Sequence, residues 1–60
     1  MNIVTIENSG IQIAYLSEDN GNSWTRREGP LTDKLSREEF ANDLADMIKH
    51  QWEIVRFEKF

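Results

Sequence analysis

The chain contains no cysteine and only one histidine, His50, among its 60 residues. The lack of cysteine excludes disulfide bridges and thiolate metal sites, and one histidine cannot form a histidine-rich metal centre. A domain this small buries only about 60% of the surface that its unfolded chain exposes, so its stability is marginal. Disulfides, a metal or a partner subunit usually support such folds. Of these three supports only a partner subunit remains. We therefore consider a homodimer in which each chain forms a single domain, residues 1–60.

Long apolar stretches are also missing. No segment approaches the roughly 20 apolar residues that a membrane-spanning helix requires. The first residues, MNIVTIENSG, do not combine a basic segment with an apolar one, so the sequence predicts no signal peptide. We therefore expect a cytoplasmic protein with no membrane partner.

Positive charge is scarce, with seven lysines and arginines against eleven aspartates and glutamates and a formal net charge of −4. Phosphate contacts require clustered basic residues, so the composition argues against a nucleic-acid partner. A basic protein partner, attracted by electrostatic steering, is compatible with this charge. The simpler interpretation is that mild acidity aids solubility.

The motifs on which most enzyme predictions depend are absent as well. The sequence has no nucleophile elbow, no glycine-rich phosphate loop and no metal-ligand spacing. His50 lies near the predicted end of a helix, where a cation interacts favourably with the helix dipole, and we prefer this structural role to a catalytic one. So small a core suggests no closed pocket that would shift carboxylate pKa values. We predict that the protein is not an enzyme and binds no cofactor or metal.

Short β-branched runs separated by turn residues predict strands. The strand at 11–16 carries apolar residues on both faces, which is typical of a central strand. Asn20-Gly21 indicates a hairpin turn, and Pro30 is expected to close the arm that follows it. Residues 31–35 are interpreted as a connection to the helix. The expected strands are residues 2–6, 11–16, 23–28 and 52–60.

One amphipathic helix is predicted between the last two strands. Ser36 followed by Glu39 forms a capping box, and the helix is expected to run to about His50. The apolar stripe at i, i+4, i+7 and i+8 consists of Phe40, Leu44, Met47 and Ile48. The fold class is therefore α+β, with a three-stranded antiparallel sheet covered by one helix, in β-β-β-α-β or β-β-α-β order.

A second stripe on this helix is acidic. Glu39, Asp43 and Asp46 follow one another at i, i+4 and i+7. These acids are spaced about 6 Å apart along the helix axis. This spacing is loosely compatible with binding to a protein surface that normally contacts DNA phosphates. Like charges at i, i+4 destabilise a helix by only a few tenths of a kcal/mol, so a solvated face explains the stripe without any function.

The aromatic residues exceed what one helix over a small sheet can cover. Trp24, Trp52, Phe57 and Phe60 compete for the core with the apolar stripe of the helix. The simplest interpretation places them in the core, yet some apolar surface is expected to stay exposed in a monomer. Such a patch usually marks a partner site.

The order of segments resembles the small uracil-DNA glycosylase inhibitors of Bacillus podoviruses. The resemblance covers about residues 11–60. The segments that carry it are "IQIAYLSEDNGNSW", a polar arm ending at Gly29, "LSREEF" and "EIVRFEKF".

The resemblance implies a homodimeric phage protein that acts in the host cytoplasm and blocks host uracil-DNA glycosylase by imitating DNA. In this family the two helices of the dimer form an apolar pocket. The pocket captures the apolar side chain that the enzyme inserts into DNA, and surrounding acids replace phosphates. Phe40 matches the helix phenylalanine of the family, and Leu44 stands where the family has an aromatic residue. The predicted partner-binding residues, with Asp43 added from the acidic stripe alone, are Glu38, Glu39, Phe40, Asp43 and Leu44.

Two other functions fit the same residues. One is a different small acidic phage effector that binds a host nucleic-acid enzyme, such as RNA polymerase, a nuclease or a CRISPR complex. The other is a small structural protein whose exposed aromatic residues serve only self-association.

Overall fold

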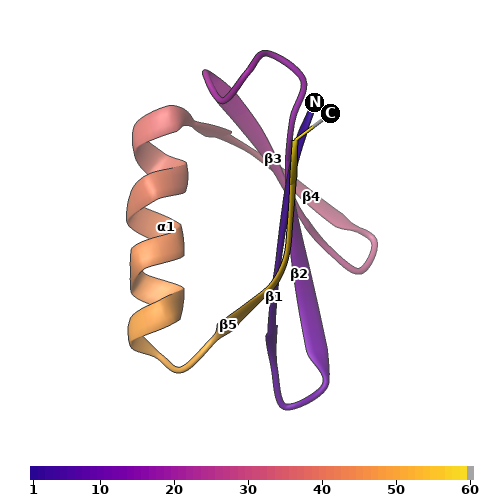
Figure 1. The fold of residues 1–60 in the computed structure, drawn as a ribbon, viewed down its shortest axis with the longest axis vertical. Coiled ribbons are helices and arrows are strands. Elements are labelled where there is room, and N and C mark those ends of the chain that lie inside the picture. The colour runs from indigo at the N-terminus through magenta and orange to yellow at the C-terminus, as the bar shows by residue number, and fades with distance from the viewer. Residues whose placement is uncertain (60) are drawn as a thin grey trace.

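The computed structural model describes residues 1–59 as a five-stranded antiparallel sheet with one helix lying against one of its faces (Figure 1). The order of strands across the sheet is β4-β3-β2-β1-β5, and the order along the chain is β-β-β-β-α-β. The elements are β1 (Asn2–Asn8), β2 (Ile11–Ser17), β3 (Ser23–Glu28), β4 (Leu31–Ser36), α1 (Arg37–Lys49) and β5 (Glu53–Lys59). The predicted α+β class with one helix on an antiparallel sheet is confirmed, but the expected three strands and both expected orders are wrong.

β4 is the element that the sequence analysis missed. Residues 31–35 were expected to form a connection, yet Leu31–Ser36 pairs with the whole of β3. Gly29 has a φ of 58°, and the fixed φ of Pro30 suits the next position of a tight hairpin turn. Pro30 therefore lies in the turn rather than in the ladder, and the chain can pair again directly after it. The polar sequence TDK conceals this strand because a sheet edge in solvent does not require apolar residues.

β5 contains a bulge that strict alternation cannot predict. Thr5 of β1 is paired with Arg56, but Ile6 is paired with Ile54, so Val55 is an extra residue in the ladder. The bulge reverses the alternation and turns Ile54 and Phe57 toward the same face of the sheet. Strict period-two alternation along this strand would have placed these two residues on opposite faces. Phe60 lies outside the described residues.

The core lies between the helix and the middle of the sheet. The predicted central strand β2 is the third of the five strands, which confirms that prediction. The buried residues come from β1, β2 and β3 and are Val4, Ile6, Ile13, Tyr15, Ser17 and Trp24. The partly buried apolar side chains that pack against them are Leu35, Phe40, Leu44, Met47 and Trp52.

The predicted capping box is confirmed at the start of α1. The amide of Glu39 donates to Ser36 Oγ at 3.1 Å, and the amide of Ser36 donates to Glu39 Oε1 at 2.9 Å. At the other end His50 is the C-cap, and its amide donates to the Asp46 carbonyl at 3.1 Å. Gln51 then adopts a φ of 70° and turns the chain toward β5. Within residues 1–59, α1 is too short and too polar to cross a membrane.

Candidate partner-binding surface

An aromatic cluster attaches the first half of α1 to the sheet. The ring of Phe40 stacks on Trp24 with centroids 3.9 Å apart and planes 12° apart. The same ring meets Tyr15 edge-on, with a centroid distance of 5.2 Å and an angle of 72°. The edge-on contact is a favourable arrangement of an aromatic pair, and the stacked contact buries apolar area of both rings. Phe40 is only partly buried, so this cluster belongs both to the core and to the surface.

Beside this cluster the surface forms an open hollow of about 510 Å³. Phe40 and Trp24 supply its aromatic wall, and the turn between β2 and β3 supplies a polar side. The lining residues are Asn20, Gly21, Asn22, Trp24, Arg37, Phe40 and Ala41. We call this feature the aromatic hollow. It is a concave surface with an apolar wall at the end of α1 where partner-binding residues were predicted.

Hydrogen bonds fix the turn that borders the aromatic hollow. The indole Nε1 of Trp24 donates to the Gly21 carbonyl at 3.2 Å. The carboxylate of Asp19 accepts from the amide and the hydroxyl of Ser23 at 2.9 and 2.6 Å, and from Ser17 Oγ at 2.9 Å. The hydrogen bonds from Ser23, followed by the one from Ser17, lower the pKa of Asp19 to about 2. Asp19 therefore stays ionised to a lower pH than an ordinary aspartate does, and its hydrogen bonds hold the turn in place.

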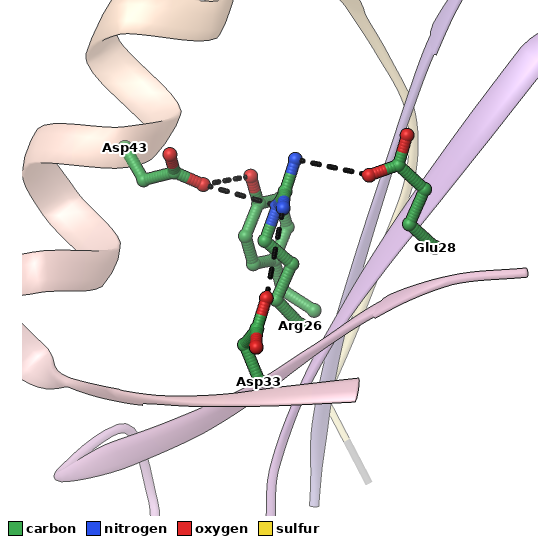
Figure 2. Close-up of polar contacts among 5 residues, drawn as sticks. Arg26, Glu28, Asp33 and Asp43 are labelled. Carbon is green, nitrogen blue, oxygen red and sulfur yellow. Dashed lines mark hydrogen bonds and ion pairs between the residues drawn. The ribbon is translucent and has the colours of Figure 1, made fainter. Parts of the chain in front are cut away.

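Asp43 faces the sheet, where Tyr15 and Arg26 engage its charge (Figure 2). The hydroxyl of Tyr15 donates to Asp43 Oδ2 at 2.5 Å. Arg26 Nε lies 3.4 Å from the same oxygen, at ion-pair distance but without hydrogen-bond geometry. The Arg26 guanidinium also lies 3.5 Å from Glu28 and 4.0 Å from Asp33. Burial, followed by the hydrogen bond to Asp43, raises the pKa of Tyr15 to about 12.

The acidic stripe of α1 is therefore not a uniform solvated face. Asp43 is compensated by Arg26, and Asp46 Oδ1 lies 3.6 Å from His50 Nδ1. Glu39 is exposed but belongs to the capping box, where the hydrogen bond from the Ser36 amide lowers its pKa and keeps it ionised. Glu38, in the same first turn, is exposed to solvent.

The five predicted residues divide into two groups. Glu38 and Glu39 lie at the surface of the first helical turn, whereas Phe40, Asp43 and Leu44 are partly buried against the sheet. Only Phe40 lines the aromatic hollow. The stacking of Trp24 on Phe40 and the pairing of Arg26 with Asp43 were not predicted from the sequence. Trp24 follows the Asn20-Gly21 turn so closely that its place beside the turn could have been inferred, but no local pattern connects Arg26 to α1.

No protein-family model, curated protein or solved structure matches this chain. Among residues 1–59, no group of three or more His, Cys, Asp or Glu residues is arranged to hold a metal ion.

Proposed function

We propose that this chain is a phage protein that inhibits host uracil-DNA glycosylase by imitating DNA. The observation that carries the proposal is the aromatic hollow, because its wall contains Phe40, the residue that matches the helix phenylalanine of the glycosylase inhibitors. The hollow is formed within one chain, between α1 and the β2–β3 turn, whereas the family's pocket lies between the two helices of a dimer. An apolar side chain of the enzyme, which normally enters the duplex, is proposed to enter this hollow. Burying one such side chain contributes roughly 1.5–3 kcal/mol.

The charge near the hollow supports binding to an enzyme surface that is built for DNA. Glu38 and Asp19 each adjoin a lining residue in the sequence, and Asp19 is held ionised by its hydrogen bonds. Rim charges of this kind mainly raise the association rate, while an apolar anchor at the centre supplies most of the affinity. The enzyme also spends a few kcal/mol on unstacking a base when it binds DNA. A preformed hollow requires no such step, so a protein can compete with the substrate.

A second candidate function follows from Arg37. This basic residue lines the hollow at a place where a mimic of phosphates would be expected to be acidic. Arg37 departs from the acidic pattern of the family, so the second candidate target is a different host enzyme, such as RNA polymerase, a nuclease or a CRISPR complex. In both cases the protein acts by occupying a partner's surface and performs no chemistry.

The test is uracil excision from a single-stranded oligonucleotide by the host glycosylase, with increasing amounts of this protein. Stoichiometric loss of excision is the expected result. Ala41→Gln, which places a larger polar side chain in the aromatic hollow, should weaken inhibition at least about 10-fold. Ala45→Gln is the matched control, because Ala45 is exposed one turn further along α1 and does not line the hollow.

Two outcomes would contradict the proposal. Unchanged excision at micromolar protein removes the glycosylase as the target and promotes the second candidate. Equal inhibition by the Ala41 and Ala45 variants, with both variants folded, removes the hollow as the binding site.

A further inference from the structure

The face of the sheet that lies opposite α1 in Figure 1 carries a second hollow, with a volume of about 430 Å³. We call it the open-face hollow. Its charged lining residues are Glu18, Asp19, Arg27 and Lys34. It shares no lining residue with the aromatic hollow, although both hollows border the turn between β2 and β3.

Strand pairing places one row of side chains across the floor of the open-face hollow. Leu16 follows the buried Tyr15 in β2 and therefore points away from the core. Thr25 of β3 is opposite Leu16, and Lys34 of β4 is opposite Thr25, so these three side chains share a face. Leu16 and Thr25 are half-buried, whereas Lys34 is exposed. The floor is therefore a rigid part of the sheet rather than a loop.

Arg27 and Lys34 form a pair of cations in this hollow. Arg27 lies two residues after Thr25 and on the same face of the sheet. It is opposite Thr32, so Lys34, two residues further along β4, is its diagonal neighbour. Diagonal positions lie about 7–8 Å apart, which long side chains can bridge. Within residues 1–59 neither of the two cations forms an ion pair, so both are available to one anion.

The other end of the open-face hollow is acidic, and its two acids differ. The carboxylate of Asp19 accepts hydrogen bonds from Ser17 and Ser23 and is thereby fixed in the turn. Glu18 is exposed and makes no hydrogen bond or ion pair in the part of the chain that the structure describes. Ser23, beside these acids, lies four residues before Arg27, a distance of about 13 Å along an extended strand. The hollow therefore has cations at one end and an available carboxylate at the other.

This arrangement suits a ligand with a phosphate at one end and hydroxyl groups at the other. The three terminal oxygens of a phosphate monoester can accept from Arg27, Lys34 and the Thr25 hydroxyl together, whereas a carboxylate has only two oxygens. The ionised carboxylate of Glu18 accepts hydrogen bonds but cannot donate them, so it fits hydroxyl groups and repels a second anion. Leu16, on the floor, offers apolar surface to the C–H groups of a sugar ring.

We propose that the open-face hollow binds a sugar phosphate, with the phosphate on Arg27 and Lys34 and a sugar hydroxyl on Glu18. The volume of the hollow lies in the range of small-molecule sites, roughly 300–1,000 Å³. The net charge of −4 repels anions in general, so phosphate binding requires this local pair of cations. Because the hollow lies on the face away from α1, this inference goes beyond the proposed function and does not depend on it.

Titration of the folded chain with ribose 5-phosphate in phosphate-free buffer, followed by nitrogen-15 NMR, tests the site. A saturable shift of the amide signals of Thr25, Arg27 and Lys34 is expected, with a dissociation constant below about 1 mM. Arg27→Gln and Lys34→Gln should each weaken binding at least about 10-fold, because each removes a charge-assisted hydrogen bond. Arg56→Gln is the matched control and should change binding less than about 3-fold. Arg56 is also an exposed cation on this face, but it is paired with Glu58 and does not line the hollow.

Inorganic phosphate distinguishes a sugar-phosphate site from a simple attraction of anions. It should bind the wild type at least about 5-fold more weakly than ribose 5-phosphate does, because it has no sugar hydroxyl to reach Glu18. Glu18→Ala should weaken the binding of ribose 5-phosphate at least about 5-fold and should not weaken that of inorganic phosphate, since it removes a repelling charge. Glu38→Ala, which removes the same charge from α1, should change neither affinity more than about 3-fold.

Three results would overturn the inference: no saturable shift up to about 10 mM ribose 5-phosphate, equal affinity of the wild type for ribose 5-phosphate and inorganic phosphate, or equal losses in the Arg27→Gln and Arg56→Gln variants. All substituted side chains are exposed, and circular dichroism of each variant verifies its fold. None of these measurements involves uracil excision, so the open-face hollow and the proposed function can fail separately.

Discussion

Two clusters, one helical turn apart, attach α1 to the sheet by opposite chemistry. The first is the aromatic contact of Phe40 with Trp24 and Tyr15, and the second is the polar contact of Asp43 with Tyr15 and Arg26. Tyr15 belongs to both, since its ring packs on Phe40 and its hydroxyl reaches Asp43. The aromatic cluster gains stability from area removed from water and tolerates an open hollow beside it. In the polar cluster, the cost of removing a group from water offsets most of what its contacts contribute, so this cluster fixes the position of the helix but adds little net stability.

The largest effect is expected from the aromatic cluster. Phe40→Ala removes a ring that stacks on Trp24 and should lower the free energy of unfolding by about 3 kcal/mol, at the lower end of the range for such changes because Phe40 is only partly buried. Phe40→Leu keeps most of the apolar volume and should cost about 1 kcal/mol. Urea unfolding followed by tryptophan fluorescence measures both values. A Phe40→Ala variant as stable as the wild type would show that the stack contributes nothing to the attachment of α1.

The polar cluster should respond less, and in a way that depends on what replaces the carboxylate. Asp43→Ala leaves the Tyr15 hydroxyl without an acceptor and removes the carboxylate that lies at ion-pair distance from Arg26, and it should cost about 2 kcal/mol. Asp43→Asn retains an acceptor for Tyr15 and should cost about 1 kcal/mol. The matched control is Asp46→Ala, at an exposed position one turn later, which should stay within about 0.5 kcal/mol of the wild type in urea unfolding. If Asp43→Ala and Asp46→Ala lower the free energy of unfolding by the same amount, the contact of Asp43 with the sheet contributes nothing to stability.

The two clusters also differ in how far the sequence could reveal them. The helix side of the aromatic cluster was accessible, because the spacing of Phe40, Leu44 and Met47 predicts an apolar helix face. The alternation of β2 leaves apolar residues on both faces, so it does not show that Tyr15 lies under the helix. Part of the polar cluster was accessible as well. Asp43 stands three residues after Phe40 and thus on the same side of the helix, although the acidic stripe suggested that it faces solvent.

What could not be predicted depends on pairing between distant segments. Arg26 lies beside Tyr15 only because β3 pairs with β2, and the bulge at Val55 exists only in the ladder with β1. β4 was missed for a related reason: its polar residues lie on an edge, and Pro30 indicates the end of a strand unless the turn that contains it is known. Local patterns specify which residues are apolar and where turns occur, but register is a property of two strands. The candidate site follows the same rule, since Phe40 was predicted and the hollow it shares with the β2–β3 turn was not.

The two roles of Tyr15 are separated by an effect that is absent at neutral pH and appears only at alkaline pH. The pKa of Tyr15 is raised from 10.0 to about 12, so the folded state prefers the neutral phenol more strongly than the unfolded state does. This contribution to stability is complete below pH 10 and is lost as the pH rises from 10 to 12. Because the chain has only one tyrosine, the absorbance of tyrosinate reports its ionisation directly. In the folded protein we expect the midpoint of tyrosine ionisation near pH 12. This midpoint should fall in the Asp43→Ala variant, because the phenol loses its hydrogen bond to Asp43. Tyr15→Phe should retain the packing on Phe40 and lose the decline in stability over this pH range. A midpoint near pH 10 in the folded wild type would mean that the phenol is solvated and that only its ring connects the two clusters.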